Sequence, residues 1–203
     1  MKAILPWMLA AALALPGMSR AAGLSYSYVE GGYAETEIEA DGVDMDGEGY
    51  RVTGSLAVGP TYHIIAEYST AELEVENFDI DVDIDTLSVG FGYNRPINQR
   101  ADVIGRILYV DSDVEVDSPF FNVSGDDSGL GLQFHLRGQV MERVEAEGGI
   151  DYVDIGDEDT TLVLEGRYWL TDALALGAGL RFGDDTTSYG VSLRFNFRAS
   201  VTP

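Results

Sequence analysis

The 203-residue sequence predicts an all-β fold, a closed antiparallel transmembrane β-barrel of about ten strands. Three features indicate this fold: apolar residues alternate with small or charged residues, tyrosines end the apolar rows, and short connections alternate with longer acidic ones. Alternation with a period of two is typical of strands rather than helices. A closed barrel also satisfies every backbone hydrogen-bonding group in lipid. An eight-stranded barrel, in which two of the segments belong to loops, is the alternative.

The first residues have the features of a secretory signal. A positively charged start precedes an apolar stretch over residues 3–16, and Ser19-Arg20-Ala21 supplies the small residues of a cleavage site. The apolar stretch is shorter than the roughly 20 residues that a membrane-spanning helix needs. We therefore predict a cleaved signal peptide over residues 1–21, a barrel domain over residues 22–203, and export from the cytoplasm of a bacterium.

Ten segments of the remaining chain alternate, and each is expected to form one strand. In chain order they are Leu24 to Ala34, Tyr50 to Val58, Tyr62 to Ser69, Leu87 to Tyr93, Val103 to Tyr109, Leu130 to Arg137, Val144 to Tyr152, Leu162 to Trp169, Leu174 to Phe182 and Tyr189 to Phe197. The first segment is the least regular. In it Tyr26 and Tyr28 have the opposite parity to Val29 and Tyr33, which predicts a bulge or a shorter strand.

The apolar parity is expected to face lipid. Its ends carry the aromatic residues that suit the headgroup boundary, as two girdles around an apolar band. These are Tyr50, Tyr62, Tyr68, Tyr93, Tyr109, Tyr152, Tyr168 and Tyr189. A soluble β-sandwich would also alternate, but it would not need such girdles.

The connections differ in length and charge. Tight links at 59–60, 94–100, 138–142 and 171–172 are interleaved with longer stretches at 35–48, 71–85, 111–127, 153–160 and 183–187. The longer stretches contain no Lys or Arg, although the chain has 12 of these residues against 35 Asp plus Glu and a formal charge of −23. Such a balance excludes a nucleic-acid binder, and the long acidic loops are expected to face the cell exterior.

Two stretches carry a family resemblance. Residues 24–33, Leu-Ser-Tyr-Ser-Tyr-Val-Glu-Gly-Gly-Tyr, and residues 89–94, Val-Gly-Phe-Gly-Tyr-Asn, are similar to motifs of small proteobacterial outer-membrane β-barrel proteins, broadly of the OmpA and OmpX type. The resemblance implies a monomer in the outer membrane of a Gram-negative bacterium, in contact with lipid and lipopolysaccharide. The strand ending at Phe197 also resembles the signal that the barrel-assembly machinery reads.

The polar parity places charges of both signs in the predicted lumen. They are Glu30, Arg51, Glu67, Arg106, Arg137, Glu145, Glu147, Asp151, Glu165, Arg167, Arg181 and Arg194. Because an unpaired charge in a narrow lumen is costly, we expect a salt-bridge network that closes the barrel. The alternative is a gate in a narrow cation-preferring, porin-like pore.

The two histidines, His63 and His135, fall on the inward parity near the short-turn ends of their strands. A hydrolase at the outer rim would need its histidine at the opposite end, and no Ser-His-Asp arrangement is evident. We predict a non-enzymatic protein, and a rim hydrolase is the third hypothesis.

Carboxylates are dense in the first three acidic loops. Hard cations such as Ca²⁺ and Mg²⁺ prefer several oxygen ligands, and Asp-x-Asp spacing brings carboxylates together where a loop turns. The candidate ligands are Asp41, Asp44, Asp46, Glu48, Asp81, Asp83, Asp85, Asp111 and Asp113. A repulsive, solvated surface explains the same residues, and Asp81 to Asp85 alternates with apolar residues as an extended strand pair would. Weak cation binding, or an external partner, is expected in either case.

Overall fold

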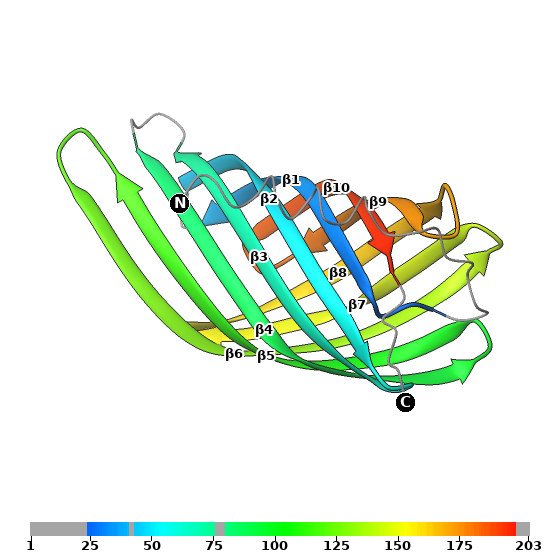
Figure 1. Cartoon of the computed structure of the whole chain (residues 1–203). Coiled ribbons are helices and arrows are strands. Elements are labelled where there is room, and N and C mark those ends of the chain that lie inside the picture. The colour runs from blue at the N-terminus through cyan, green and yellow to red at the C-terminus, as the bar shows by residue number, and fades with distance from the viewer. Residues whose placement is uncertain (1–23, 41–42, 76–79, 198–203) are drawn as a thin grey trace.

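A computed structural model describes residues 24–40, 43–75 and 80–197 (Figure 1). The predicted signal peptide over residues 1–21 lies outside the described residues. Ten antiparallel strands form a closed barrel in which each strand pairs with its neighbours in sequence, and β1 pairs with β10. The predicted all-β barrel is confirmed with ten strands, and the eight-stranded alternative is wrong. No helix among the described residues is long and apolar enough to cross a membrane.

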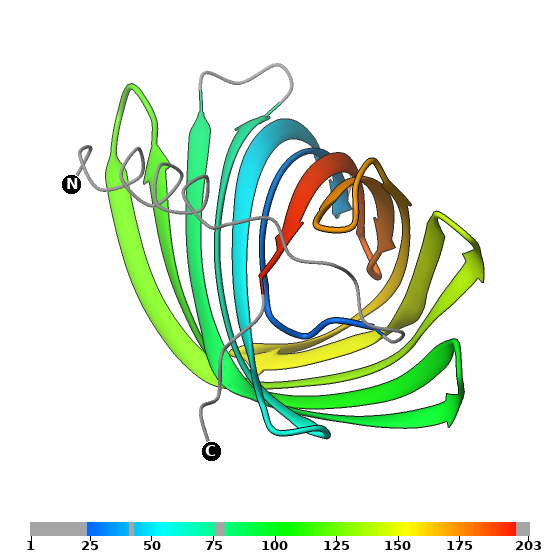
Figure 2. The same ribbon diagram turned by 45° about the vertical axis from the view of Figure 1, so that its right-hand side comes forward.

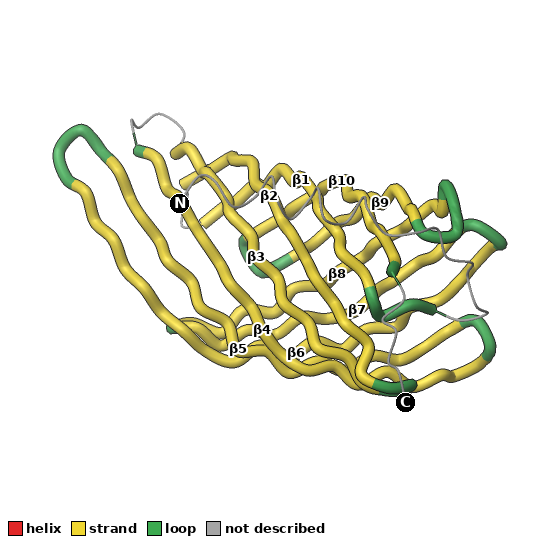
Figure 3. Tube along the Cα trace, in the orientation of Figure 1, coloured by secondary structure: helices red, strands yellow, loops and turns green. Residues whose placement is uncertain are grey.

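The strands extend over most of the chain (Figure 3). They are β1 (Tyr28–Ala40), β2 (Val43–Val58), β3 (Tyr62–Val75), β4 (Asp81–Asn98), β5 (Ala101–Asp117), β6 (Asn122–Met141), β7 (Val144–Ile155), β8 (Asp157–Trp169), β9 (Leu174–Phe182) and β10 (Thr186–Asn196).

The predicted acidic loops are largely strand, and this corrects the sequence analysis. Strand β4 begins at Asp81, β5 continues to Asp117 and β6 begins at Asn122, so that β3 to β6 project beyond β8 to β10 at the acidic end of the barrel (Figure 1). The physical reason is that the alternation does not stop where the acidic residues begin. Val82 and Ile84 alternate with the aspartates of β4, and Val114 and Val116 alternate with the acidic residues of β5, which continues the strand pattern past the expected end.

Of the two alternatives for the first segment, a bulge or a shorter strand, the shorter strand is confirmed. It begins at Tyr28 rather than Leu24, and the residues before it are not part of the sheet. All four predicted short links contain turns, but the links predicted over 94–100 and 138–142 are mostly strand, because β4 continues to Asn98 and β6 to Met141. The turn between β2 and β3 contains Gly59 with a φ of 77°, a conformation that favours glycine. These turns gather at the end of the barrel opposite the acidic extension (Figure 1).

The types of residue on the two faces of the sheet change between the short-turn end of the barrel, here called the lower end, and the acidic end, called the upper end. In the lower band of β5 Ile107 and Tyr109 face outward and are exposed, whereas Arg106 faces the lumen and is buried. Above this band the same outward parity carries acidic residues, and the inward parity carries apolar ones such as Val110 and Val114. The lower band has the apolar exterior of a transmembrane barrel, with tyrosines at its edges, as predicted.

Candidate functional site

The lower lumen contains a buried network of charges. All twelve charged residues predicted to face the lumen take part in ion pairs, most of them in this network and the others in two pairs nearer the acidic end. Arg137 and Glu145 lie fully inside at 0% exposure, and Arg137 Nε donates to Glu145 Oε1 at 2.8 Å. The strands bring these residues together because inward positions of β6 and β7 are adjacent in register, as Arg137 and Glu147 are.

Arg167 of β8 is the centre of this network. Its guanidinium lies 2.9 Å from Glu147, 3.3 Å from Glu145 and 3.3 Å from Glu30, and it also contacts Glu165. Arg194 of β10 contacts Glu30 as well. Ion pairs thereby connect β1, β7, β8 and β10 across the lumen. They include contacts between β1 and β10, the first and last strands, whose pairing closes the barrel.

His135 bridges two carboxylates of β7. Its Nδ1 lies 2.9 Å from Glu147 Oε1 and its Nε2 lies 2.7 Å from Asp151 Oδ1. Since both ring nitrogens face carboxylates, the doubly protonated ring, which donates from both, matches this geometry. His135 therefore acts as a further cation of the network.

The residues before β1 fold into the lumen and fill its short-turn end. Tyr26 is buried at 5% exposure, stacks on His63 at a ring-centroid distance of 4.9 Å, and donates its hydroxyl hydrogen to Asp102 at 2.8 Å. Arg137 Nη1 donates to the carbonyl of Ser25 at 3.0 Å. Figure 2 shows this segment turning inward across the barrel opening. We call residues 24–27 the plug segment.

The plug segment was not among the predicted site residues. The signal for it is the parity of Tyr26 and Tyr28, which is opposite to that of Val29. In the structure Tyr28 faces the lumen at 2% exposure, and Arg194 lies over its ring, with the Arg194 Cζ 3.9 Å from the centroid. The irregular parity therefore indicates side chains that line the lumen rather than a bulge.

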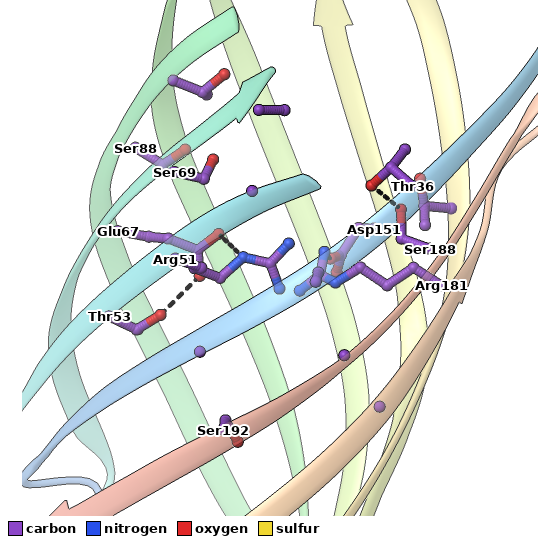
Figure 4. A pocket seen from close by; sticks show the side chains of 18 of the residues that line it. Thr36, Arg51, Thr53, Glu67, Ser69, Ser88, Asp151, Arg181, Ser188 and Ser192 are labelled. Carbon is purple, nitrogen blue, oxygen red and sulfur yellow. Dashed lines mark hydrogen bonds and ion pairs between the residues drawn. The ribbon is translucent and has the colours of Figure 1, made fainter. Parts of the chain in front are cut away.

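Above the network the lumen opens into a cavity of about 900 Å³ (Figure 4). Its lining extends from Arg106 and Arg194 at the bottom to Val114 and Asp127 near the acidic end. Two further ion pairs lie on its walls. Arg51 is 3.3 Å from Glu67, and Arg181 is 3.3 Å from Asp151.

Seven of the acidic candidates, Asp46, Glu48, Asp81, Asp83, Asp85, Asp111 and Asp113, lie on the outer surface of the extension. Because they belong to strands, the Asp-x-Asp spacing places them at alternate outward positions instead of around a turn. Directly paired positions form two rows across β1 to β5. One row is Glu37, Asp46, Glu74, Asp81 and Asp117, and the other is Glu35, Glu48, Glu72, Asp83 and Glu115.

Tyrosines at the upper edge of the apolar band donate to the lowest carboxylates of the extension. The bonds are Tyr33 to Glu48 at 2.5 Å, Tyr68 to Asp85 at 2.8 Å, Tyr109 to Asp111 at 3.0 Å and Tyr189 to Glu35 at 2.5 Å. Asp113 faces Asp85 across the β4–β5 ladder. Asp41 and the side chain of Asp44 lie outside the part of the structure that is described. Among the described residues, no three acidic or histidine side chains form a group able to hold a metal ion.

Together, the closed antiparallel sheet, its apolar outer band and its charged lumen define a transmembrane β-barrel. The family model described as outer membrane protein beta-barrel domain matches residues 8–197. The chain belongs to this family of outer-membrane proteins of Gram-negative bacteria.

Two solved structures share the fold at low sequence identity, and a third shows a weaker similarity. The β domain of the Bordetella autotransporter Brka is 12% identical over 84% of this chain and 99% of that chain, with a TM-score of 0.52. The transport unit of the autotransporter AIDA-I from Escherichia coli is 9% identical over 96% and 97%, also at 0.52. Ail, the attachment invasion locus protein of Yersinia pestis, is 17% identical over 83% and 97%, at 0.48. No curated protein matches the sequence.

Proposed function

We propose that this protein is a non-enzymatic surface barrel with a sealed lumen, whose acidic extension binds cations at the cell surface. Ca²⁺ and Mg²⁺ shared with the phosphates of neighbouring lipopolysaccharide are the proposed ligands. The observation that supports this function is the pair of carboxylate rows across β1 to β5, in which acid faces acid at every step.

The rows need a counter-ion. Like charges directly opposite on adjacent strands destabilise a sheet. The stretches 35–48, 71–85 and 111–127 contain no Lys or Arg that could offset this repulsion. Divalent cations held weakly between neighbouring carboxylates would relieve it, and the binding would be collective rather than confined to one chelating site.

Thermal unfolding of the refolded mature barrel tests this proposal. Ca²⁺ or Mg²⁺ should raise the Tm more than NaCl of equal ionic strength, because each ion offsets two carboxylates. The pair Asp83→Asn and Glu115→Gln, which face each other, should reduce that increase, whereas Asp172→Asn in the opposite turn should leave it unchanged. A Tm that is insensitive to removal of divalent cations would contradict cation binding.

A narrow cation-preferring pore is the second candidate, and the cavity of about 900 Å³ toward the acidic end favours it. The sealed barrel is supported by the buried network around Arg167 and by Tyr26 in the plug segment. Planar-bilayer conductance of the refolded protein separates the two. A silent bilayer, with folding verified by heat-modifiable gel mobility, supports the sealed barrel, and steady cation-selective steps support the pore.

A further inference from the structure

The upper lumen has an apolar wall that neither the network nor the acidic rows explain. Leu108 and Val110 of β5 form a buried cluster with Ile65, and Val153 and Ile155 of β7 pack against it. These side chains lie on the inner face of the sheet and line the cavity of about 900 Å³. A volume of this size is within the range of about 300–1,000 Å³ that is typical of small-molecule sites.

Glycines on the intervening strand make the wall continuous. In register, Leu108 of β5 pairs with Gly131 of β6, which pairs with Val153 of β7. A Cβ atom on Gly131 would lie 3.1 Å from Val110 Cγ2 and 3.3 Å from the Leu108 Cβ. The absent side chain therefore allows the apolar residues of β5 and β7 to meet over β6.

Two arginines face the cavity from its other walls. Arg51 and Arg181 each make one ion pair among the described residues, and their side chains are 34% and 24% exposed. In Figure 4 their guanidinium groups, from β2 and β9, point toward each other over the two strands between them, β1 and β10. By contrast, Arg167 in the network below has four carboxylate partners and is almost fully buried.

The neighbouring acids already have partners. Glu67 accepts a hydrogen bond from Thr53 at 2.8 Å in addition to its contact with Arg51, and Asp151 contacts His135 as well as Arg181. Two facing guanidinium groups with remaining N–H donors favour an anion between them, since it would accept from both and offset their repulsion.

We propose that this cavity binds a single-chain amphiphile with an anionic head group. Its carboxylate or phosphate would lie between Arg51 and Arg181, and its alkyl chain along Val153 and Ile155, the half-buried residues that pack over Leu108 and Val110. The acidic residues that line the cavity near its mouth, Asp126, Asp127 and Asp159, favour this orientation because they repel the head group from the rim.

Native mass spectrometry of the refolded barrel, with palmitate as the probe, tests the proposal. We expect one saturable palmitate for each barrel and at least about tenfold weaker binding of methyl palmitate, which lacks the charge. Hexadecyl phosphate in a parallel arm distinguishes a phosphorylated lipid from a free fatty acid as the better ligand. Tighter binding of hexadecyltrimethylammonium than of both anions would overturn the assignment of an anionic head group.

Matched variants locate the site. Arg181→Gln should weaken binding of palmitate about ten- to a hundredfold, because it removes a charge-assisted hydrogen bond, and should leave methyl palmitate unaffected. Val110→Thr should weaken both ligands, since it places a hydroxyl in the apolar wall. The control is Arg95→Gln, which changes an exposed arginine near the short-turn end of β4, away from the cavity. Equal effects of Arg181→Gln and Arg95→Gln, equal binding of palmitate and its methyl ester, or no saturable binding would each refute the proposal.

The acidic-row pair Asp83→Asn and Glu115→Gln separates this proposal from the proposed cation binding. These substitutions should not change palmitate binding, so either proposal can fail without the other.

Discussion

Replacement of Arg167 by methionine tests whether the network stabilises the barrel. Arg167 contacts Glu30, Glu145, Glu147 and Glu165, and its side chain is 2% exposed. Its removal would leave these carboxylates close together in a buried lumen. Loss of one partner of a buried ion pair costs about 3–5 kcal/mol, so we expect Arg167→Met to lower the free energy of unfolding by at least this amount.

Urea unfolding in lipid vesicles, followed by the fluorescence of Trp169, would measure the change. The matched control is Arg51→Met, which removes one pair at 3.3 Å from a partly exposed side chain. Solvent screening limits such a pair to about 0–1 kcal/mol. If Arg167→Met were no more destabilising than Arg51→Met, the argument that the buried network stabilises the barrel would be refuted.

Further predictions concern the plug segment and the histidines. Tyr26→Ala should lower stability by about 3–5 kcal/mol because it empties a buried ring site, and should raise conductance in planar bilayers. Tyr26→Phe keeps the ring and loses only the bond to Asp102, so it should cost about 1 kcal/mol and leave conductance unchanged. His135→Leu should cost about 3 kcal/mol in urea unfolding because Glu147 and Asp151 lose contacts of 2.9 and 2.7 Å. His63→Leu should cost less, because the polar contacts of His63 are 3.3 and 3.4 Å; a cost equal to that of His135→Leu would contradict this reasoning.

The period-two pattern predicted about ten strands and assigned the twelve charged residues of the lumen to the inward face. Strand β9, Leu174–Phe182, has its predicted bounds, because apolar and glycine residues alternate throughout it and Gly183 follows. Strand β4 was predicted too short by the same method, since Asp81, Asp83 and Asp85 suggested a loop. In an extended hairpin these aspartates face water while Val82 and Ile84 face inward, so acidic residues at one parity do not end a strand.

The plug segment and the pairing of charges could not be predicted from the sequence. Parity assigns Arg137, Glu145 and Glu147 to the lumen, but it does not give the stagger of β6 on β7 that brings Arg137 opposite Glu147. The position of Tyr26 depends on long-range contacts with His63 and Asp102, which lie on β3 and β5. Such contacts leave only the irregular parity of the first segment as a sequence signal.

One register determines both the lumen network and the acidic surface. Residues of β5 keep their parity from the apolar band to the extension, so Arg106 and Val114 face inward while Ile107 and Asp113 face outward. Along the outward positions of β5, apolar residues suited to lipid are therefore followed by acidic residues suited to water. The change occurs between Tyr109 and Asp111. A one-residue insertion between Ala101 and Arg106 would turn the Arg106 guanidinium toward lipid. It would also turn the carboxylates that follow in β5 toward the cavity. The ion pair of Arg106 with Glu147 of β7 thus opposes any slip that would also reverse the surface of the extension.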